Sequence, residues 1–308
     1  MKEIIVEQND AGQRLDRFLK KYLDKSPNSF IYKMIRKKNI KVNNKKCEIH
    51  YILQLNDCIQ LYLSDETIDK YSQVTNYQPS DTDLDVVYED QDIVVINKPI
   101  GILVQPDHTQ QVSLWDVLLQ RTNYNQSVTF RPAFCNRLDK NTSGLIIAGK
   151  TAVGLQGMNK AIRDKNVTKI YYAIVEGHVK KEQHLYGFIE RDSRIRVSTV
   201  TDNQKQGQKP IETIIRPTQH GKDYTEIQIQ LVTGKTHQIR AHLANIGHPL
   251  IGDIKYGSHV KNHTHFFLHA YSLEFKNMPQ PLEHLNEKKI VASFPQHYIK
   301  LKETLFRN

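Results

Sequence analysis

The chain has 308 residues, of which 39% are apolar and 25% are charged, and its formal net charge at pH 7 is +10. This length exceeds that of one typical compact domain, so we expect one large domain and one small one. No apolar run approaches the roughly 18 residues that a membrane helix needs, so the composition excludes a bilayer-spanning protein and indicates a globular one.

The basic residues are concentrated near the N-terminus. Residues 1–63 contain 13 Lys or Arg against 7 Asp or Glu, a net charge of +6, so a fifth of the chain carries over half of the excess. The opening segment MKEIIVEQND has acidic side chains where a secretory signal needs cations followed by an apolar run. We therefore expect no export and a cytoplasmic location.

The cysteines argue against two structural devices. Cys47, Cys58 and Cys135 are odd in number and form no CxxC pair. This pattern disfavours both a disulfide framework and a cysteine zinc site. We expect reduced, mostly buried thiols.

Two amphipathic helices are predicted first along the chain. In AGQRLDRFLKKYL the apolar residues recur at helical spacing and place one stripe on a core. The segment SPNSFIYKMIRKKN predicts a second helix with Ser26 as N-cap and Pro27 as first helical residue. Its apolar face leaves Lys33, Arg36 and Lys37 on the other side, where they present cations to a partner. A solvated helix face is the alternative explanation for these three residues.

Two short strands and a polar segment follow. The strands are IKVN (Ile40–Asn43) and CIQLYL (Cys58–Leu63), with turns at Asn43-Asn44 and Asn56-Asp57, where asparagine adopts the left-handed backbone conformation readily. From Ser64 to Ser80 the sequence is polar and without periodicity, which is typical of an exposed linker.

The remainder predicts one larger unit. We expect a hairpin in DVVYEDQDIVVINKP, a helix in SLWDVLLQR capped by Ser113, a buried strand in LIIAGK, a helix over about Thr151–Arg163, and strands in TKIYYAIVEG and YTEIQIQLV. The run KTHQIRAHLANIG predicts a helix capped by Thr236, with Arg240 in its second turn and an end near Gly247.

These elements predict an α+β protein. A small N-terminal α/β domain occupies residues 1–63, a linker 64–80, and a domain with a large mixed, mainly antiparallel sheet and flanking helices 81–308.

The tripeptide Arg-Leu-Asp occurs twice, ending at Asp16 and at Asp139. Asp16 lies near the start of a predicted helix, where the helix dipole favours a carboxylate by about 0.3–1 kcal/mol. Asp139 instead precedes the turn cluster Asn-Thr-Ser-Gly at the entrance of a strand, where loops often carry functional groups. From spacing alone, an aspartate there more often forms a turn with its own backbone.

The surrounding motif resembles a known family. The segment NRLDKNTSGL is similar to the catalytic motif of the RluA-type RNA pseudouridine synthases, and NKPIGILV, KIYYAIVEG, GKTHQIRAHL with GHPLIGDIKYG, and LHAYSLEF fall in the family's order, over about Asp81–Phe275. Residues 12–63 separately resemble the small RNA-binding domain named after ribosomal protein S-four. Asn136 stands where the family usually has histidine before this tripeptide.

The resemblance implies a reaction that isomerises uridine. The bond between sugar and nitrogen breaks, the uracil turns over, and carbon-5 rejoins the sugar. Asp139 is then the reacting carboxylate, ionised at neutral pH because an ordinary Asp pKa is near 3.9. It either attacks the ribose or takes a proton from the sugar, and the sequence leaves both routes open.

The resemblance also assigns roles to other residues. Tyr171 stacks on the target uracil and assists proton removal from carbon-5, while Tyr172 points to the opposite face of the strand. Arg240 pairs with Asp139 and keeps it charged and oriented. Arg137 fills the gap left by an extruded nucleotide, and Leu268 is assigned to substrate binding.

The partner implied is structured RNA, ribosomal RNA rather than transfer RNA, recognised at single-stranded loops or bulges because A-form helices hide their base edges. Lys33, Arg36 and Lys37 are then RNA-binding residues. No cofactor, no metal and no membrane is expected, and we expect a monomer.

Two other functions compete with this interpretation. A metalloenzyme could use His263, His265 and His269 in HTHFFLHA, but no carboxylate accompanies them, and His237 and His242 are about 140° out of phase on a helix. A non-catalytic RNA-binding module would use the basic helix equally well. Only an enzyme requires Asp139, so this residue discriminates between the two.

Overall fold

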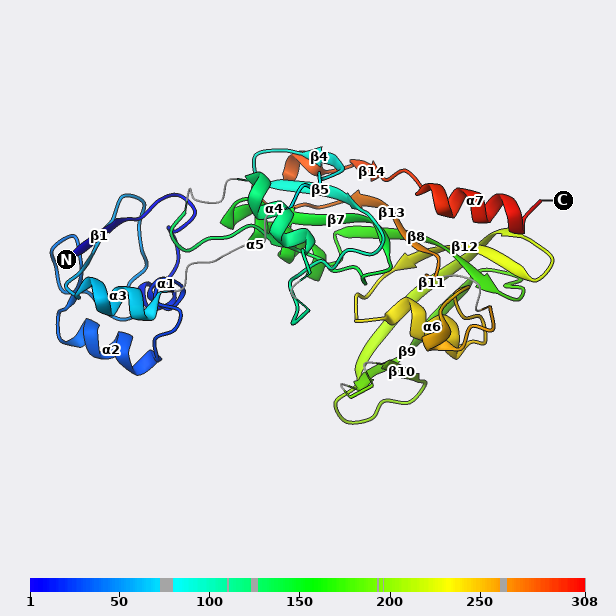
Figure 1. The fold of residues 1–308 in the computed structure, drawn as a ribbon, viewed down its shortest axis with the longest axis horizontal. Helices are drawn as coiled ribbons and strands as arrows, with labels where there is room; N and C mark the ends of the chain where they lie inside the picture. The colour runs from blue at the N-terminus through cyan, green and yellow to red at the C-terminus, as the bar shows by residue number, and fades with distance from the viewer. Residues whose placement is uncertain are drawn as a thin grey trace.

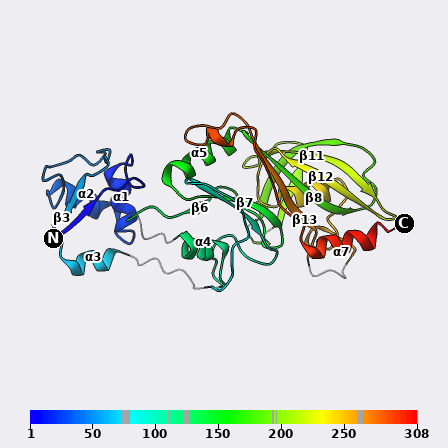
Figure 2. The ribbon, with the colours of Figure 1, turned by 90° about the horizontal axis from the view of Figure 1, so that it is seen from above.

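The structure is a computed structural model, and it describes residues 1–72, 80–109, 111–122, 127–192, 194–195, 197–260 and 265–307. These residues form two sheets, one of 3 strands and one of 11. The small sheet lies at one end of the molecule, and the C-terminal helix α7 (Gln296–Leu305) lies at the other (Figure 1, Figure 2). Within the described ranges, no helix combines the length and the apolar character needed to cross a membrane.

The N-terminal unit, residues 1–72, is built on an antiparallel sheet in the order β1-β3-β2. Its first elements are β1 (Lys2–Ile5), α1 (Leu15–Tyr22), α2 (Asn28–Arg36), β2 (Ile40–Val42) and β3 (Cys58–Leu61). The apolar faces of α1 and α2 pack on this sheet in one core. The left-handed backbone predicted for the turns is confirmed at Asn43, Asn44 and Asn56.

Helix α2 has the two faces that its sequence predicts. Ile31, Met34 and Ile35 are buried, whereas the side chains on the other face are exposed, among them Lys33, Arg36 and Lys37. The predicted cap is wrong. Pro27 is the N-cap, and the hydroxyl of Ser26 donates a hydrogen bond to the carbonyl of Leu23 at 2.8 Å. This bond ends the preceding turn and leaves the Ser26 side chain unavailable to α2.

The segment expected to be a linker begins with a helix, α3 (Asp65–Tyr71). The Ser64 hydroxyl accepts a hydrogen bond from the Thr67 amide and caps it. Ile68 is buried in the N-terminal core, and the ring of Tyr71 packs on Phe30 with centroids 4.6 Å apart. Two apolar residues among polar ones therefore suffice to dock this helix, and they are too few to give a periodic pattern. Residues 73–79 of the expected linker lie outside the described residues.

A carboxylate joins the N-terminal unit to the rest of the chain. Asp10 is fully buried and accepts hydrogen bonds from the Ser127 hydroxyl, from the Val128 amide, and from the amide and hydroxyl of Thr129. Val128 packs against the N-terminal core. Four bonds to one buried acid fix how this loop meets the N-terminal unit.

The large sheet follows the order β10-β9-β11-β12-β8-β13-β7-β5-β4, with β14 on β13 and β6 on β7. All its pairs are antiparallel except β13 with β7. Its strands are β4 (Val86–Glu89), β5 (Ile93–Lys98), β6 (Ala133–Phe134), β7 (Ser143–Gly149), β8 (Val167–Glu176), β9 (Gln183–Asp192), β10 (Val197–Thr201), β11 (Lys209–His220), β12 (Tyr224–Leu231), β13 (Leu268–Phe275) and β14 (Lys289–Val291). The predicted α+β fold with a mainly antiparallel sheet is confirmed.

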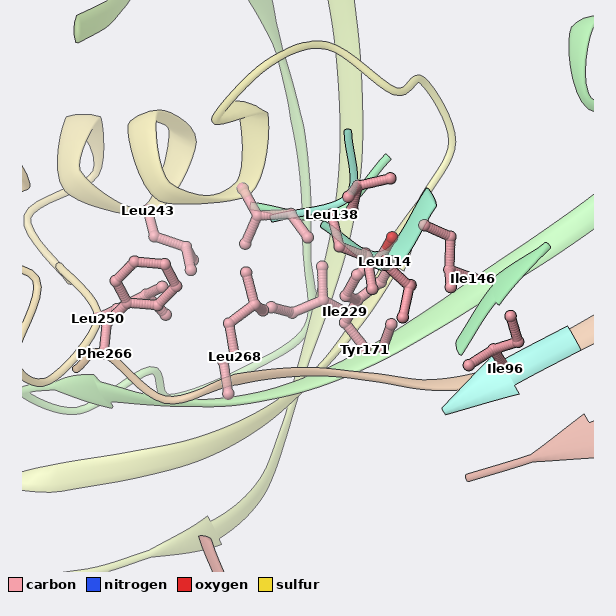
Figure 3. Close-up of a cluster of buried hydrophobic side chains, with 14 of the residues drawn as sticks. Ile96, Leu114, Leu138, Ile146, Tyr171, Ile229, Leu243, Leu250, Phe266 and Leu268 are labelled. Atoms are coloured by element: carbon pink, nitrogen blue, oxygen red, sulfur yellow. The ribbon is translucent and has the colours of Figure 1, made fainter. Parts of the chain in front are cut away.

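Helices cover this sheet and complete its core. They are α4 (Leu114–Thr122), α5 (Ala152–Arg163), α6 (Gln238–Asn245) and α7, with short 3-10 turns η2 (Ile254–Tyr256) and η3 (Glu283–Leu285). The predicted cap of α4 by Ser113 is confirmed. The helix expected over about Thr151–Arg163 is also present, and the Thr151 hydroxyl caps it by accepting from the Gly154 amide. The main core joins side chains of α4, α6 and the strands between them, and Tyr171 and Phe266 belong to it (Figure 3). The three cysteines are free, as expected, but half-buried rather than buried.

The one parallel joint in the described sheet requires a glycine. At the start of β7, Gly144 pairs with Ala270 of β13 and has a φ of +105°. A Cβ there would lie 2.2 Å from the carbonyl oxygen of Ala270. The glycine of the NTSG segment is therefore set by backbone approach and places the preceding loop against β13.

We predict that Gly144→Ala lowers the free energy of unfolding by at least about 3 kcal/mol, because a methyl group would push two strands apart in the core. Gly207→Ala is the matched control: its φ of +86° is also positive, but nothing lies within 4 Å of the added Cβ. The control should lose only about 1–2 kcal/mol. Urea denaturation of both variants measures this, and equal losses would contradict the steric explanation.

Candidate active site

A cavity of about 1060 Å³ opens beside the central strands. Among its described lining residues are nine Lys or Arg side chains but only two carboxylates, Asp107 and Asp139. Such a surface attracts polyanions and repels cations. Asp139, Tyr171, Arg240 and Arg137, which the sequence singled out, all line it.

The Asp139 loop lies between β6 and β7 and is fixed on both sides of the carboxylate. Leu138 is buried in the main core, and the Thr142 amide donates a hydrogen bond to the carbonyl of Asp139 at 3.0 Å. The Asp139 side chain itself stays 26% exposed, toward the cavity. Within the described residues its carboxylate makes no hydrogen bond to its own loop, so the self-turn interpretation finds no support.

Lys98 anchors this loop from behind. Its fully buried ammonium group donates hydrogen bonds to the carbonyls of Pro99 at 2.8 Å and Lys140 at 3.0 Å. The Gly101 amide also donates to the Lys140 carbonyl. Burial lowers the pKa of Lys98 to about 7, although the negative charge of Asp139 opposes the shift. The NKPIG segment therefore holds the residue that follows Asp139.

The guanidinium of Arg240 connects two carboxylates. Its Nη1 donates to Asp139 at 3.0 Å, while Nε and Nη2 donate to the two oxygens of Asp253 at 2.7 and 2.8 Å. The bidentate contact fixes the plane of the guanidinium, the planar fork of Arg240, so one N–H must point at Asp139. The expected pairing of Arg240 with Asp139 is thus present in the structure.

Arg240 is almost enclosed. Its side chain is 8% exposed and that of Asp253 2%. The rings of Tyr256 and Phe266 stack on the guanidinium, with centroids 4.8 and 4.3 Å from its central carbon. Burial lowers the pKa of Arg240, but the hydrogen bonds and charges of the two carboxylates outweigh it and raise that pKa. The arginine is therefore a fixed positive charge.

Helix α6, which carries Arg240, begins later than predicted. His237 and not Thr236 is its N-cap, so Arg240 lies in the first turn rather than the second, while the predicted end near Gly247 is confirmed. The helix is held by Gln238, whose amide donates to the carbonyl of Glu212 and accepts from the amide of Lys235. Gln238 therefore ties the start of α6 to β11 and to the preceding loop, and no side chain caps the helix at its described N-cap, His237.

His237 completes the surroundings of Asp139. It has a left-handed backbone with φ of +57°, which is strained for histidine, and its Nε2 lies 3.8 Å from the carboxylate. The Tyr256 hydroxyl accepts from the Ser198 amide and lies 2.9 Å from His237 Nδ1. This network favours the tautomer with its proton on Nε2, facing Asp139. Burial lowers the pKa of His237, so it is neutral at neutral pH.

Tyr171 and Tyr172 point to opposite faces of β8, as expected. Tyr171 is buried in the main core and lines the cavity, whereas Tyr172 packs against Tyr271 and Phe294 on the other side. Burial and the charge of Asp139 raise the pKa of Tyr171 above its usual value. Its phenol is therefore protonated at neutral pH.

Two neighbours of Asp139 differ in their contacts. Arg137 is exposed, lines the cavity and has no hydrogen bond or ion pair with any described residue. Asn136 accepts a hydrogen bond from the Ile147 amide at 2.9 Å, which ties the loop to β7. The asparagine at this position therefore supports the strand entrance.

Leu268 is placed differently from its expected role. It is buried in the main core at the start of β13 and is not among the described residues that line the cavity. Phe266, two residues earlier, lines it instead. Both side chains belong to the buried cluster drawn in Figure 3. The resemblance identified the segment but not the side chain that faces the cavity.

The other Arg-Leu-Asp copy has a different environment. Asp16 lies at the start of α1 as predicted, but it is buried and accepts two hydrogen bonds from Arg14, at 3.0 and 2.6 Å. The bonds from Arg14 hold the pKa of Asp16 below its usual value. The helix dipole alone is therefore an incomplete explanation, because a local ion pair within the N-terminal unit holds this carboxylate.

The metal hypothesis gains no support from the described residues, in which no three His, Cys, Asp or Glu side chains group as metal ligands. His263 lies outside them. His269 instead pairs through Nδ1 with the Ser143 hydroxyl at 2.9 Å.

A family model described as RNA pseudouridylate synthase matches residues 92–245. An uncharacterized RNA pseudouridine synthase of Mycoplasma capricolum is 30% identical and covers 95% of this chain and 98% of its own. Ribosomal large subunit pseudouridine synthase C of Pasteurella multocida is 31% identical, with 90% and 86% covered. The solved structure of human RNA pseudouridylate synthase domain containing 4 shares the fold, with a TM-score of 0.58, 21% identity, and 71% and 92% covered.

We predict that Asp253→Ala lowers the free energy of unfolding by roughly 3 kcal/mol or more, because it removes the bidentate partner of a buried arginine. The pair Arg216–Glu182 offers a control, since its side chains are 57% and 42% exposed. Glu182→Ala should cost much less, because water screens an exposed ion pair. Chemical denaturation measures the free energy of unfolding of both variants. A small loss in Asp253→Ala would show that Arg240 keeps its position without this carboxylate.

Proposed function

The chain belongs to the RNA pseudouridine synthase family, and from this premise we propose that it converts specific uridines of ribosomal RNA to pseudouridine with Asp139 as the reacting carboxylate. The observation that carries the proposal is the contact between Arg240 and Asp139 inside a strongly cationic cavity. The ribosomal target is inferred from the relative of Pasteurella multocida, whose name specifies the large ribosomal subunit.

The reaction is balanced without a co-reactant. The bond between ribose C1′ and uracil N1 breaks, a bond between C1′ and C5 forms, and the proton lost from C5 is matched by one gained at N1. Asp139 either attacks the ribose or takes a proton from it, and both routes need an ionised, oriented carboxylate. The hydrogen bond from the Arg240 guanidinium sets the direction of that carboxylate.

Tyr171 is assigned to stacking on the uracil ring rather than to removal of the C5 proton. A phenol that is protonated at neutral pH can stack on uracil or donate a hydrogen bond, but it cannot accept the C5 proton. The raised pKa of Tyr171 therefore supports stacking as its role. Its position in the core, on a strand paired on both sides, keeps the ring in one orientation.

Arg137 is assigned to the place in the RNA stack that the extruded nucleotide has vacated. Extruding a nucleotide costs a few kcal/mol of stacking, and a planar cation can occupy the vacated place. Arg137 is exposed at the cavity and unpaired within the described chain, so it is available for this contact.

Residues 1–63 are proposed as an RNA-binding domain and 81–308 as the catalytic domain. The exposed face of α2 carries Lys33, Arg36 and Lys37, and phosphate contacts from such a face give affinity without choosing a sequence. We propose further that the protein acts in the cytoplasm as a monomer.

We predict that Asp139→Asn reduces pseudouridine formation by at least roughly 1,000-fold while RNA affinity changes little, because the amide neither attacks nor accepts a proton. Asp16→Asn is the matched control, since it changes the other Arg-Leu-Asp copy and leaves the cavity intact. Each variant is incubated with RNA from cells that lack the protein, and the pseudouridine formed in that RNA is quantified. An active Asp139→Asn variant would favour the non-catalytic binding module.

We predict that replacing Lys33, Arg36 and Lys37 together by Gln weakens RNA binding. The plot of log affinity against log salt, which falls with salt, should become less steep by roughly 2, because about three phosphate contacts disappear. The turnover rate at saturating RNA should not change. Filter binding at several salt concentrations measures the slope. An unaltered slope would indicate that this face is only solvated.

A further inference from the structure

Lys169 is a buried cation that faces the cavity. It lies on β8 two residues before Tyr171, so both side chains project from the same face of the strand, about 7 Å apart along it. Lys169 is 8% exposed and lines the cavity. No described residue accepts a hydrogen bond from its ammonium group or forms an ion pair with it.

This isolation is costly. A buried charge is normally paired or hydrogen-bonded, because removing it from water is expensive. The other enclosed cations of the cavity region follow this rule: Lys98 donates to two carbonyls and Arg240 to two carboxylates. For Lys169, burial lowers the pKa and no neighbouring charge opposes the shift. A stable protein keeps such a group where a ligand supplies the missing partner.

The surroundings indicate an anionic ligand. Arg163 and Lys165, at the end of α5, line the same cavity and are exposed. Lys165 lies 3.6 Å from Glu212, and Arg163 lies 3.7 Å from Asp164, both as solvent-exposed pairs. Such pairs are weak and exchange readily. Three cations therefore line the cavity together with Tyr171, and among these, within the described residues, only Lys169 has no carboxylate neighbour.

We propose that Lys169 anchors a phosphate subsite that binds a phosphodiester of the substrate RNA beside the nucleotide stacked on Tyr171. The inference rests on the proposed function, because it takes the occupant of the cavity to be an extruded nucleotide. An ammonium group acts as a point charge on phosphate and needs no bidentate geometry. Lys169 thereby holds the backbone while Asp139 meets the sugar, and it is a substrate-binding residue with no part in bond breaking.

The test compares Lys169→Met, which keeps the length and removes the charge, with Lys169→Arg, which keeps the charge. Lys222→Met is the control, because Lys222 is exposed in the turn between β11 and β12, outside the cavity lining. RNA from cells that lack the protein serves as substrate for the full-length chain. The readouts are KM, kcat, the salt dependence of RNA binding, and the Tm.

In Lys169→Met we expect KM to rise roughly tenfold with kcat nearly unchanged. The salt slope should fall by about 0.7, as expected for one lost contact to single-stranded RNA. The Tm should rise, because an unpaired buried charge has been removed. Lys169→Arg should restore most of the affinity, and Lys222→Met should behave as the wild type.

A lower kcat with unchanged KM would overturn the proposal, because it would place Lys169 in the chemistry. An unchanged KM and salt slope with a lower Tm would overturn it in favour of a structural role. Neither result would affect the proposed function, which fails only if the wild-type protein forms no pseudouridine in the same assay.

Discussion

The site depends on one guanidinium that is shared between two carboxylates. Asp253 occupies two donors of Arg240 and thereby leaves a third directed at Asp139. Because the arginine and Asp253 are both enclosed, their contact is strong only as long as its geometry is kept. The two aromatic rings that cover the guanidinium exclude water and prevent the fork from turning. The Asp139 carboxylate is therefore oriented by a charge that is itself held in place.

The fold brings this group together from distant parts of the sequence. The loop of Asp139 enters β7, which lies beside β13 only because Gly144 lets the two backbones approach. Lys98, from the neighbouring β5, holds the carbonyl that follows the acid. Arg240 arrives on α6, which is fastened to β11 through Gln238. A rigid sheet thus fixes both partners of the ion pair while leaving the cavity side of Asp139 accessible.

Much of this could be predicted from the sequence, where local patterns decide the outcome. Hydrophobic periodicity identified most helices and strands, and the motif around Asp139 identified the acid and its arginine partner. Helix starts were less predictable: Ser26 and Thr236 are good capping residues, but the chain begins each helix one residue later. Helix α3 has too few apolar residues to give a pattern. Asp253 could not be assigned because its contact with Arg240 depends on how the turn after α6 folds back.

The most direct test is a crystal structure of the protein with an RNA that carries 5-fluorouridine at the position it modifies. Fluorine replaces the C5 hydrogen that must leave as a proton, so the reaction should stop after the uracil has turned over. The account predicts that this nucleotide lies in the cavity, with its ribose against Asp139, its base on Tyr171, and the contact between Asp139 and Arg240 intact. A nucleotide bound elsewhere, or a ribose out of reach of Asp139, would contradict it.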